Sequence, residues 1–289
     1  MKNINTSNYQ KYHSCSFEMS RALTKMYSTS FYSASSLFSK NIRSAIYSIY
    51  GFVRIADEIV DSFHEHNQKE LLDAFEQSYR LAYEQGVSTN PVLHSFQLTV
   101  RRYGISEEYI EAFLSSMRAD LEKKEYKTVE ETAKYIYGSA DVVGLMCLKV
   151  FCQGDEKLFK ELEYPAMKLG SAFQKVNFLR DLQDDCLVLG RIYFPNLSID
   201  RINEATKIEL VREIEQDFEE AYSGIKKLPV GVRLAVYTAY KYYRGLLNKI
   251  KRTPAERLVK TRVRVPNYQK GLLLLSSIIK NQIVFHDFK

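Results

Sequence analysis

Two segments of this chain each carry a pair of aspartates four residues apart within an otherwise apolar sequence. Asp57 and Asp61 lie in SIYGFVRIADEIVD, and Asp181 and Asp185 lie in KLGSAFQKVNFLRDLQDD. Residues four apart share one face of a helix, where two like charges destabilise an isolated helix by about 0.2–0.5 kcal/mol. The spacing therefore indicates that a cation lies beside each pair. Oxygen ligands without histidine or cysteine favour Mg²⁺ over Zn²⁺.

A single pair of this kind also has a simpler interpretation. It is typical of a surface helix whose acids meet water, and Arg54 stands at the spacing of ion pairs with Asp57 and Glu58. The second copy favours a metal site, because each pair shares a polar stripe roughly 80° wide with further residues. These are Tyr47, Tyr50 and Arg54 beside the first pair, and Gly170, Gln174 and Asn177 beside the second.

Carboxylates on two helices with arginines close by suit chemistry on a diphosphate. Arg54 precedes the first pair, and Arg180 and Arg191 flank the second. A diphosphate is a poor leaving group until metal ions and arginines neutralise the charge that builds up as its C–O bond breaks. The apolar residues around the acids would house a hydrocarbon chain and keep a carbocation away from water.

Composition predicts one all-α domain over residues 1–289. The chain is 45% hydrophobic, which allows a substantial core, and it has only 12 glycines and 6 prolines. Strand-like alternation of Val, Ile and Thr is scarce, and no change in composition indicates a linker.

Helical periodicity and breaker residues predict where the helices lie. We expect one helix at about 40–63, amphipathic helices over 67–116 with breaks near 85–91 and 103–106, and a charged connection over 121–132. Further helices are predicted for AKYIYGSADVVGLMCLKVF, for the segment of the second acid pair, for an exposed stretch after it, and for VRLAVYTAYKYYRGLLNKIKR. Residues 1–17 are weakly periodic and predict a frayed lead-in or a short helix.

The cysteine pattern and the charge limit the class of protein. The four cysteines have no CxxC spacing and no histidines near them, so neither disulfides nor a zinc site is expected, and a cytoplasmic location is predicted. The net charge of +6 suits a phosphate-bearing partner or an anionic membrane surface. We expect no nucleic-acid partner, because no binding motif accompanies this charge.

A basic run near the C-terminus contains Arg257, Lys260, Arg262, Arg264 and Lys270. It is either a solvated face or a contact for a diphosphate or a lipid headgroup. The apolar segment 271–279 that follows is shorter than the roughly 20 residues that span a bilayer. Any membrane contact is therefore expected to be peripheral, on the inner face.

The two acid segments, the GRIYFP that follows the second, and YIYGSADVVG between them resemble the signature regions of the squalene/phytoene synthases. The resemblance runs from about residue 28 to 280, in the family's order and spacing. It implies a single all-α isoprenoid synthase domain with helices around a central cavity. It also implies Mg²⁺-dependent head-to-head condensation of two prenyl diphosphates through a cyclopropylcarbinyl diphosphate.

Within this family the sequence is most similar to the bacterial phytoene synthases. That similarity implies that two geranylgeranyl diphosphates give phytoene through prephytoene diphosphate, in carotenoid biosynthesis, without a nicotinamide cofactor. Squalene or dehydrosqualene synthesis from farnesyl diphosphate is the enzymatic alternative, since pocket depth selects the chain length. A non-catalytic all-α lipid-binding relative is the alternative from another class.

The resemblance also implies roles for individual residues. The implied Mg²⁺ ligands are Asp57, Asp61, Asn177, Asp181 and Asp185. The implied diphosphate and substrate contacts are Arg54, Arg180, Arg191, Ser28, Ser30, Tyr50, Gln174 and Tyr243. Tyr135 is expected beside the reacting carbons, with Arg54 and Arg180 as the other catalytic residues. The chain departs from many relatives at Tyr27 and Thr29, where they have His and Lys.

Overall fold

The computed structural model describes residues 2–195 and 202–263 of the chain. These residues form helices, and their one extended pairing is an isolated parallel bridge between Glu125 and Ile192. The first half contains α1 (Lys2–Tyr27), α2 (Thr29–Ser35), α3 (Lys40–Ser62), α4 (Gln68–Gln85), α5 (Pro91–Tyr103) and α6 (Glu107–Glu122). The second half contains α7 (Val129–Ile136), the π-helical turn η1 (Tyr137–Asp141), α8 (Val142–Cys152), α9 (Glu156–Leu187), α10 (Glu204–Ile225), α11 (Val230–Arg252) and α12 (Ala255–Leu258). The predicted all-α class is confirmed.

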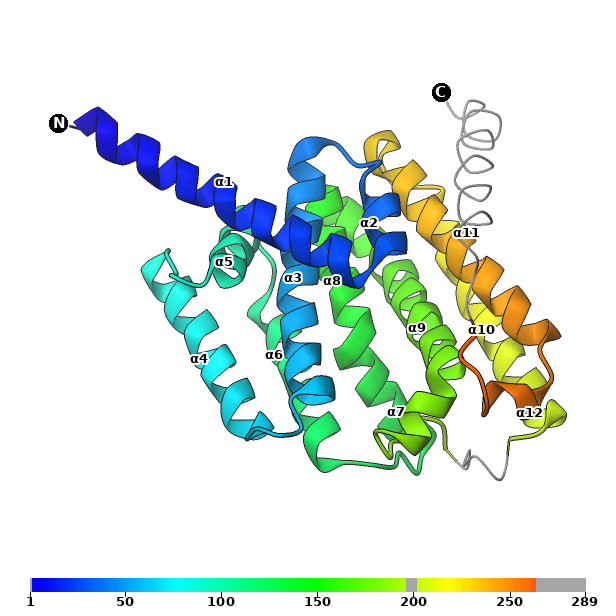
Figure 1. The fold of residues 1–289 in the computed structure, drawn as a ribbon. Coiled ribbons are helices and arrows are strands. Elements are labelled where there is room, and N and C mark those ends of the chain that lie inside the picture. The colour runs from blue at the N-terminus through cyan, green and yellow to red at the C-terminus, as the bar shows by residue number, and fades with distance from the viewer. Residues whose placement is uncertain (1, 196–201, 264–289) are drawn as a thin grey trace.

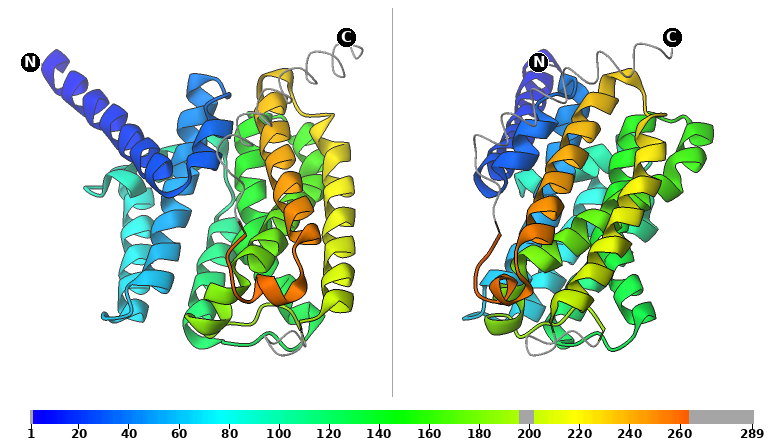
Figure 2. Two further views of the ribbon diagram at one scale, coloured as in Figure 1. Left: turned by 45° about the vertical axis from the view of Figure 1, so that its right-hand side comes forward. Right: turned by 90° about the vertical axis from the view of Figure 1, so that its right-hand side faces the viewer.

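The long helices lie side by side in one bundle (Figures 1 and 2). Helix α9 packs against α8 and α10, α3 packs against α5 and α8, and α1 crosses α3 and α5 with its N-terminal part projecting from the bundle. Helices α3 and α9 both carry their C-terminal turns at the lower end in Figure 1. The two acid pairs, which lie in those last turns, are therefore at the same end of the bundle.

The predicted breaks between helices have local causes. Gly86 (φ 72°) follows α4 and Gly104 (φ 60°) follows α5, both in the left-handed conformation that favours glycine. The side chains of Asn67 and Asn90 accept hydrogen bonds from the first turns of α4 and α5. The charged connection is shorter than predicted, since α6 extends to Glu122 and α7 begins at Val129.

Of the two alternatives predicted for residues 1–17, the frayed lead-in is wrong and the helix is longer than predicted, because a continuous helix runs from Lys2 to Tyr27. Its buried stripe consists of Ser16, Ser20 and Thr24, which are all fully buried. Ser16 Oγ donates to a backbone carbonyl within α1 at 2.8 Å, and Ser20 Oγ lies 2.8 Å from Ser95 Oγ on α5. A search for apolar periodicity does not detect a helix whose buried face is made of hydroxyls.

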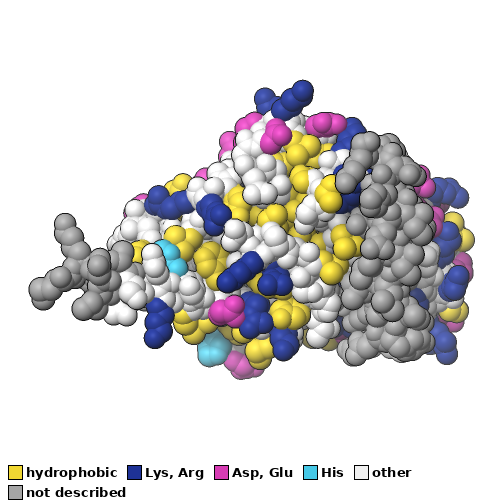
Figure 3. Space-filling model, turned by 90° about the horizontal axis from the view of Figure 1, so that it is seen from above, with side chains coloured by type: hydrophobic (Ala, Val, Ile, Leu, Met, Phe, Trp, Pro, Cys, Tyr) yellow, Lys and Arg dark blue, Asp and Glu magenta, His cyan; other side chains and the backbone are white. Residues whose placement is uncertain are grey.

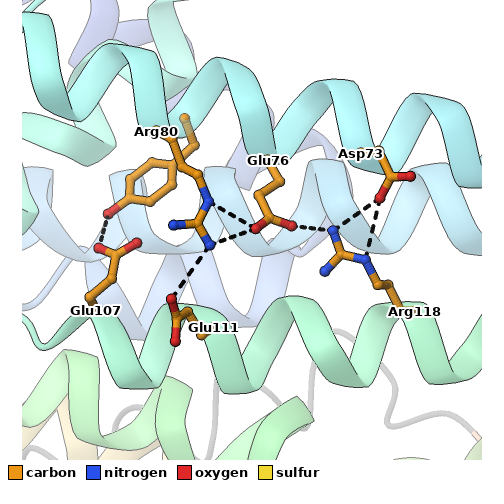
Figure 4. A network of polar contacts seen from close by, with 7 residues as sticks. Asp73, Glu76, Arg80, Glu107, Glu111 and Arg118 are labelled. Atoms are coloured by element: carbon orange, nitrogen blue, oxygen red, sulfur yellow. Dashed lines mark hydrogen bonds and ion pairs between the residues drawn. The ribbon is translucent and has the colours of Figure 1, made fainter.

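An aromatic core and a polar network join the helices on the side of α4. The rings of Phe52 and Phe96 stack with their centroids 4.0 Å apart. At the surface, Glu76 on α4 pairs with Arg80 and with Arg118 on α6, and the network continues to Asp73 and Glu111 (Figure 4). Beside it, the Tyr79 hydroxyl donates to Glu107 of α6. Exposed ion pairs of this kind contribute little each, so this side is a scaffold held mainly by its apolar core.

The stretch from α7 through α8 is the central helix of the bundle. Val129–Cys152 is long and apolar enough to cross a membrane, but 61% of its most apolar window is buried inside the protein. Gly138, Gly144 and Gly170 let it approach its neighbours closely. A Cβ on Gly138 would lie 2.5 Å from the Ala112 carbonyl oxygen of α6, and one on Gly170 would lie 2.7 Å from that of Ala140. These glycines are therefore required by packing.

Asp141, at the end of η1, is buried and accepts a 2.7 Å hydrogen bond from Ser171 of α9. Burial raises the pKa of this carboxyl from 3.8 to about 7, with Ser171 opposing the shift. The folded protein therefore holds this proton up to a higher pH than the unfolded chain does. The contribution of this bound proton to the free energy of unfolding is complete below about pH 4 and is lost as the pH rises through 7.

We expect Asp141→Asn to remove this part of the pH dependence. At pH 8 the variant should have the higher free energy of unfolding, by at most about 4 kcal/mol, because its neutral amide still accepts from Ser171. Urea unfolding of wild type and variant at pH 5 and pH 8 measures the difference. An equal difference at both pH values would contradict the expectation.

Candidate active site

A cavity of about 620 Å³ lies in the middle of the bundle. Every residue to which the sequence assigned a role lines it: Ser28, Ser30, Tyr50, Arg54, Asp57, Asp61, Tyr135, Gln174, Asn177, Arg180, Asp181, Asp185, Arg191 and Tyr243. They come from the α1–α2 junction and from α2, α3, α7, α9 and α11, with Arg191 on the loop after α9. Residues far apart in the sequence thus meet at one cavity, while their individual roles stay predictions.

The two acid pairs face each other at one end of this cavity. Removal from bulk water, together with repulsion from Asp61, raises the pKa of Asp57 to about 7. The pKa of Asp185 rises to about 8, through burial and then through repulsion from Asp181 and Asp61. All four acids lie in the last turns of α3 and α9, where the helix macrodipole is also negative. Positive charge at this end of the cavity therefore stabilises the ionised acids.

The donor set fits a hard divalent cation. Besides the acids it contains Asn177, whose amide oxygen is buried without a hydrogen-bond partner. Within residues 2–195 and 202–263, no three His, Cys, Asp or Glu side chains are close enough together to hold an ion as they stand. Carboxylate and amide oxygens are the ligands that Mg²⁺ accepts, usually together with water or phosphate oxygens. The residues that would hold it are Asn177 and the four acids.

Three predicted arginines border the acid end. Arg54 forms an ion pair with Glu58 on its own helix and lies 4.5 Å from the centre of the Tyr27 ring. Its side chain therefore makes the predicted intrahelical ion pair while also lining the cavity. Arg180 Nε lies 2.9 Å from Asp181 Oδ1.

Arg191 connects the segment after α9 to the C-terminal end of α3. Its Nη1 lies 2.6 Å from Asp61 Oδ1, and its Nη2 donates to the Val60 carbonyl at 3.0 Å, which caps the C-terminal turn of α3. The side chain of Arg191 is only 6% exposed. This arginine therefore fixes the segment after α9 against the end of α3.

Tyr135 is held by an acid that the sequence did not indicate. Its hydroxyl donates to Asp120 Oδ2 at 2.7 Å, and the Tyr193 hydroxyl lies 3.3 Å from Asp120 Oδ1. Burial raises the pKa of Asp120 to about 7. Asp120 stands in a charged stretch and resembles an exposed acid, but it follows Met117 by three residues on the apolar face of α6. That position on the helix was the available signal.

The remaining wall is apolar and aromatic. Tyr243 stacks on Phe173 with ring centroids 3.8 Å apart, and Tyr50 stacks on Phe31 at 5.0 Å. Ser28 accepts a hydrogen bond from the Phe31 amide and so caps α2 while it lines the cavity. Small side chains leave room in the wall at many positions, namely Ala34, Ala140, Ala166, Ala221, Ala235 and Ala239. A cavity that is charged at one end and apolar elsewhere suits a long hydrocarbon with a charged head group.

Comparison with known proteins identifies the family. The family model described as squalene/phytoene synthase matches residues 24–269. The chain is 30% identical to a phytoene synthase of Arthrospira platensis, over 90% of this chain and 91% of that protein. It is 28% identical to a 15-cis-phytoene synthase of Synechocystis sp., over 93% and 86% of the two chains.

Solved structures show the same fold. A dehydrosqualene synthase crystallised with a ligand superposes with a TM-score of 0.83 at 25% identity, covering 95% of this chain and 99% of that one. A squalene synthase of Alicyclobacillus acidocaldarius superposes with a TM-score of 0.71 at 24% identity, covering 82% and 93%. Since the family model covers most of the chain and the fold agrees, this protein belongs to the squalene/phytoene synthase family.

Proposed function

We propose that this protein is a phytoene synthase. It condenses two geranylgeranyl diphosphates head to head, through prephytoene diphosphate, to phytoene in carotenoid biosynthesis. The observation that carries the proposal is the cavity in which acids of two helices and three arginines face each other at one end, with apolar walls beyond. The similarity to phytoene synthases over nine tenths of the chain supports it.

In this proposal, the residues that line the cavity have different roles, which follow from their chemistry. Bound Mg²⁺ would neutralise the diphosphate and make it a better leaving group. Arg54 and Arg180 supply positive charge beside the departing diphosphate, and the tyrosine and phenylalanine rings of the wall surround the cationic hydrocarbon and exclude water. Tyr135, oriented by Asp120, faces the same space.

The proposed function also specifies the chain length of the substrate. The dehydrosqualene synthase at TM-score 0.83 keeps a C15 substrate as the alternative. The alanines along the cavity wall favour the longer C20 chain, because each small side chain leaves room that a larger one would fill.

Product analysis tests this proposal. Purified protein with Mg²⁺ and geranylgeranyl diphosphate, without NADPH, is expected to give a C40 hydrocarbon, and chelation with EDTA is expected to abolish product. The hydrocarbon is extracted and identified by mass. Efficient turnover of farnesyl diphosphate to a C30 product would instead assign squalene or dehydrosqualene chemistry. A folded sample that converts neither substrate would favour the non-catalytic lipid-binding alternative.

We also propose that the protein is cytoplasmic and binds membranes peripherally. Arg257 and Lys260 of the basic run are exposed, whereas Arg264, Lys270 and segment 271–279 lie outside the described residues. The face seen from above also mixes hydrophobic side chains with lysines and arginines (Figure 3).

Flotation with anionic liposomes is expected to carry the protein upward at low salt and less at high salt. The double variant Arg257→Gln/Lys260→Gln should float less than wild type. Unchanged flotation of that variant would indicate that the face in Figure 3, and not the basic run, contacts the membrane. Failure of wild type to float at either salt concentration would contradict peripheral binding.

A further inference from the structure

A cluster of histidine and tyrosine rings joins the N-terminal half of α1 to α5. The rings of His13 on α1 and His94 on α5 lie edge to face with their centroids 4.9 Å apart. The Tyr9 ring lies 4.3 Å from that of His13, and the Tyr12 ring lies 4.8 Å from that of His94. The lining of the central cavity includes none of these four residues. The proposed reaction therefore gives them no role.

The same cluster fastens α1 to the connection between α4 and α5. The Tyr12 hydroxyl donates to the Ser88 carbonyl at 2.6 Å, and the Tyr9 hydroxyl donates to the Gly86 carbonyl at 3.3 Å. His94 contacts this connection from α5, because its Nδ1 accepts a hydrogen bond from the Ser88 amide at 3.2 Å. Since Nδ1 is an acceptor, the hydrogen of the neutral ring is on Nε2.

The surroundings of His94 disfavour its protonated form. The residue is 0% exposed, and its Nε2 is buried without a hydrogen-bond partner. Protonation would add a hydrogen to Nδ1, directly against the Ser88 N–H, and a positive charge beside His13. The titratable side chains around the ring are Tyr9, Tyr12 and His13 of α1, and none of them is negatively charged near neutral pH. Burial, and then repulsion from His13, lowers the pKa of His94 from 6.5 to about 4.

We propose that the contact of His13 with His94 is an acid-sensitive latch, which holds the N-terminal half of α1 on α5 while His94 is neutral and releases it when His94 is protonated. The opening is local. The second half of α1 stays in place, because Ser20 Oγ lies 2.8 Å from Ser95 Oγ of α5 in a contact that does not titrate. The latch lies outside the cavity, so this inference does not depend on the proposed function.

The pH range follows from the proton affinity of His94 in the two states. In the open state the ring meets water, regains its ordinary pKa of 6.5 and binds a proton more readily than in the closed state. The closed state is therefore fully favoured above about pH 6.5 and loses this advantage as the pH falls toward 4. Between pH 7.5 and pH 5.0 the ratio of open to closed molecules should rise about 10- to 30-fold.

Hydrogen exchange of the full chain at pH 7.5 and pH 5.0, corrected for the intrinsic exchange rate at each pH, tests the latch. In wild type we expect the amides of residues 9–17 to lose about 10- to 30-fold of their protection at pH 5.0, while those of the buried helix α8 keep theirs. His94→Asn is expected to keep the same protection at both pH values. Its Oδ1 can still accept from the Ser88 amide, but its side chain does not titrate.

His13→Phe is a second variant, which keeps an aromatic ring against His94 but removes a ring that can carry positive charge. It should lose less protection at pH 5.0 than wild type does. His66→Asn is the matched control, because His66 is exposed in the turn after α3 and lies outside the cluster. It should respond to pH as wild type does.

Equal protection of residues 9–17 at the two pH values in wild type would overturn the proposal. An equal loss in wild type and in His94→Asn would also overturn it, because the titrating group would then lie elsewhere. A loss in His13→Phe as large as that of wild type would contradict the role of His13. Wild type that shows the expected exchange but makes no phytoene would contradict the proposed function and leave the latch standing.

Discussion

Asp57→Asn and Asp181→Asn should each lower turnover of prenyl diphosphate by about a thousandfold or more. Both acids line the charged end of the cavity, one on α3 and one on α9. An amide keeps the shape of the side chain but loses the negative charge that holds a divalent cation, and without that cation the diphosphate leaves poorly. Initial rates with saturating substrate over a range of Mg²⁺ concentrations measure the loss.

Stability separates this loss from unfolding. The raised pKa of Asp57 means that its charge destabilises the folded protein at pH 8, so Asp57→Asn should unfold at the same or a higher temperature. Asp181→Asn loses ion pairs with Arg180 and Arg262 and should be slightly less stable. Asp73→Asn, which removes an exposed acid paired with Arg118, is the control and should retain full activity. Full activity of either cavity variant would rule out a shared metal cluster.

Gly138→Ala should lower the free energy of unfolding by about 2–3 kcal/mol. Its added methyl would lie 2.5 Å from the Ala112 carbonyl oxygen and against the Ser116 hydroxyl, so α6 and η1 must move apart. The same shift would disturb Tyr135 and its bond to Asp120, because Tyr135 lies at the end of α7, directly before η1, and Asp120 lies on α6. We therefore expect turnover to fall together with stability. Urea unfolding and product formation measure the two effects.

Gly231→Ala is the control for this prediction. Gly231 lies in the first turn of α11, and a Cβ there would meet nothing within 4 Å. Alanine has the higher helix propensity, so this variant should be as stable as wild type or slightly more stable. If both substitutions lower the free energy of unfolding equally, the close contact of η1 with α6 is not the reason that position 138 requires glycine.

The helical class, several helix boundaries and the placement of each acid pair on one helix face were predictable from local patterns. The spacing of Asp57 and Asp61 places both on one helix face whatever surrounds them, because the pitch of the α-helix is fixed. Breaks after α4 and α5 follow from glycines and asparagine caps, which act within a few residues. The signature segments then located the residues that line the cavity.

Other features depended on how the helices pack. The buried face of the helix over residues 2–27 is made of hydroxyls that carry no apolar pattern, and one of them, on Ser20, bonds across to α5. The partners of Tyr135 and Asp181 are Asp120 and Arg262, from segments distant in the sequence. Periodicity shows which face of a helix is buried, but it does not show which residues of another helix meet that face. Those pairings are settled when the helices pack, and here they bring an additional acid and an additional arginine to the cavity.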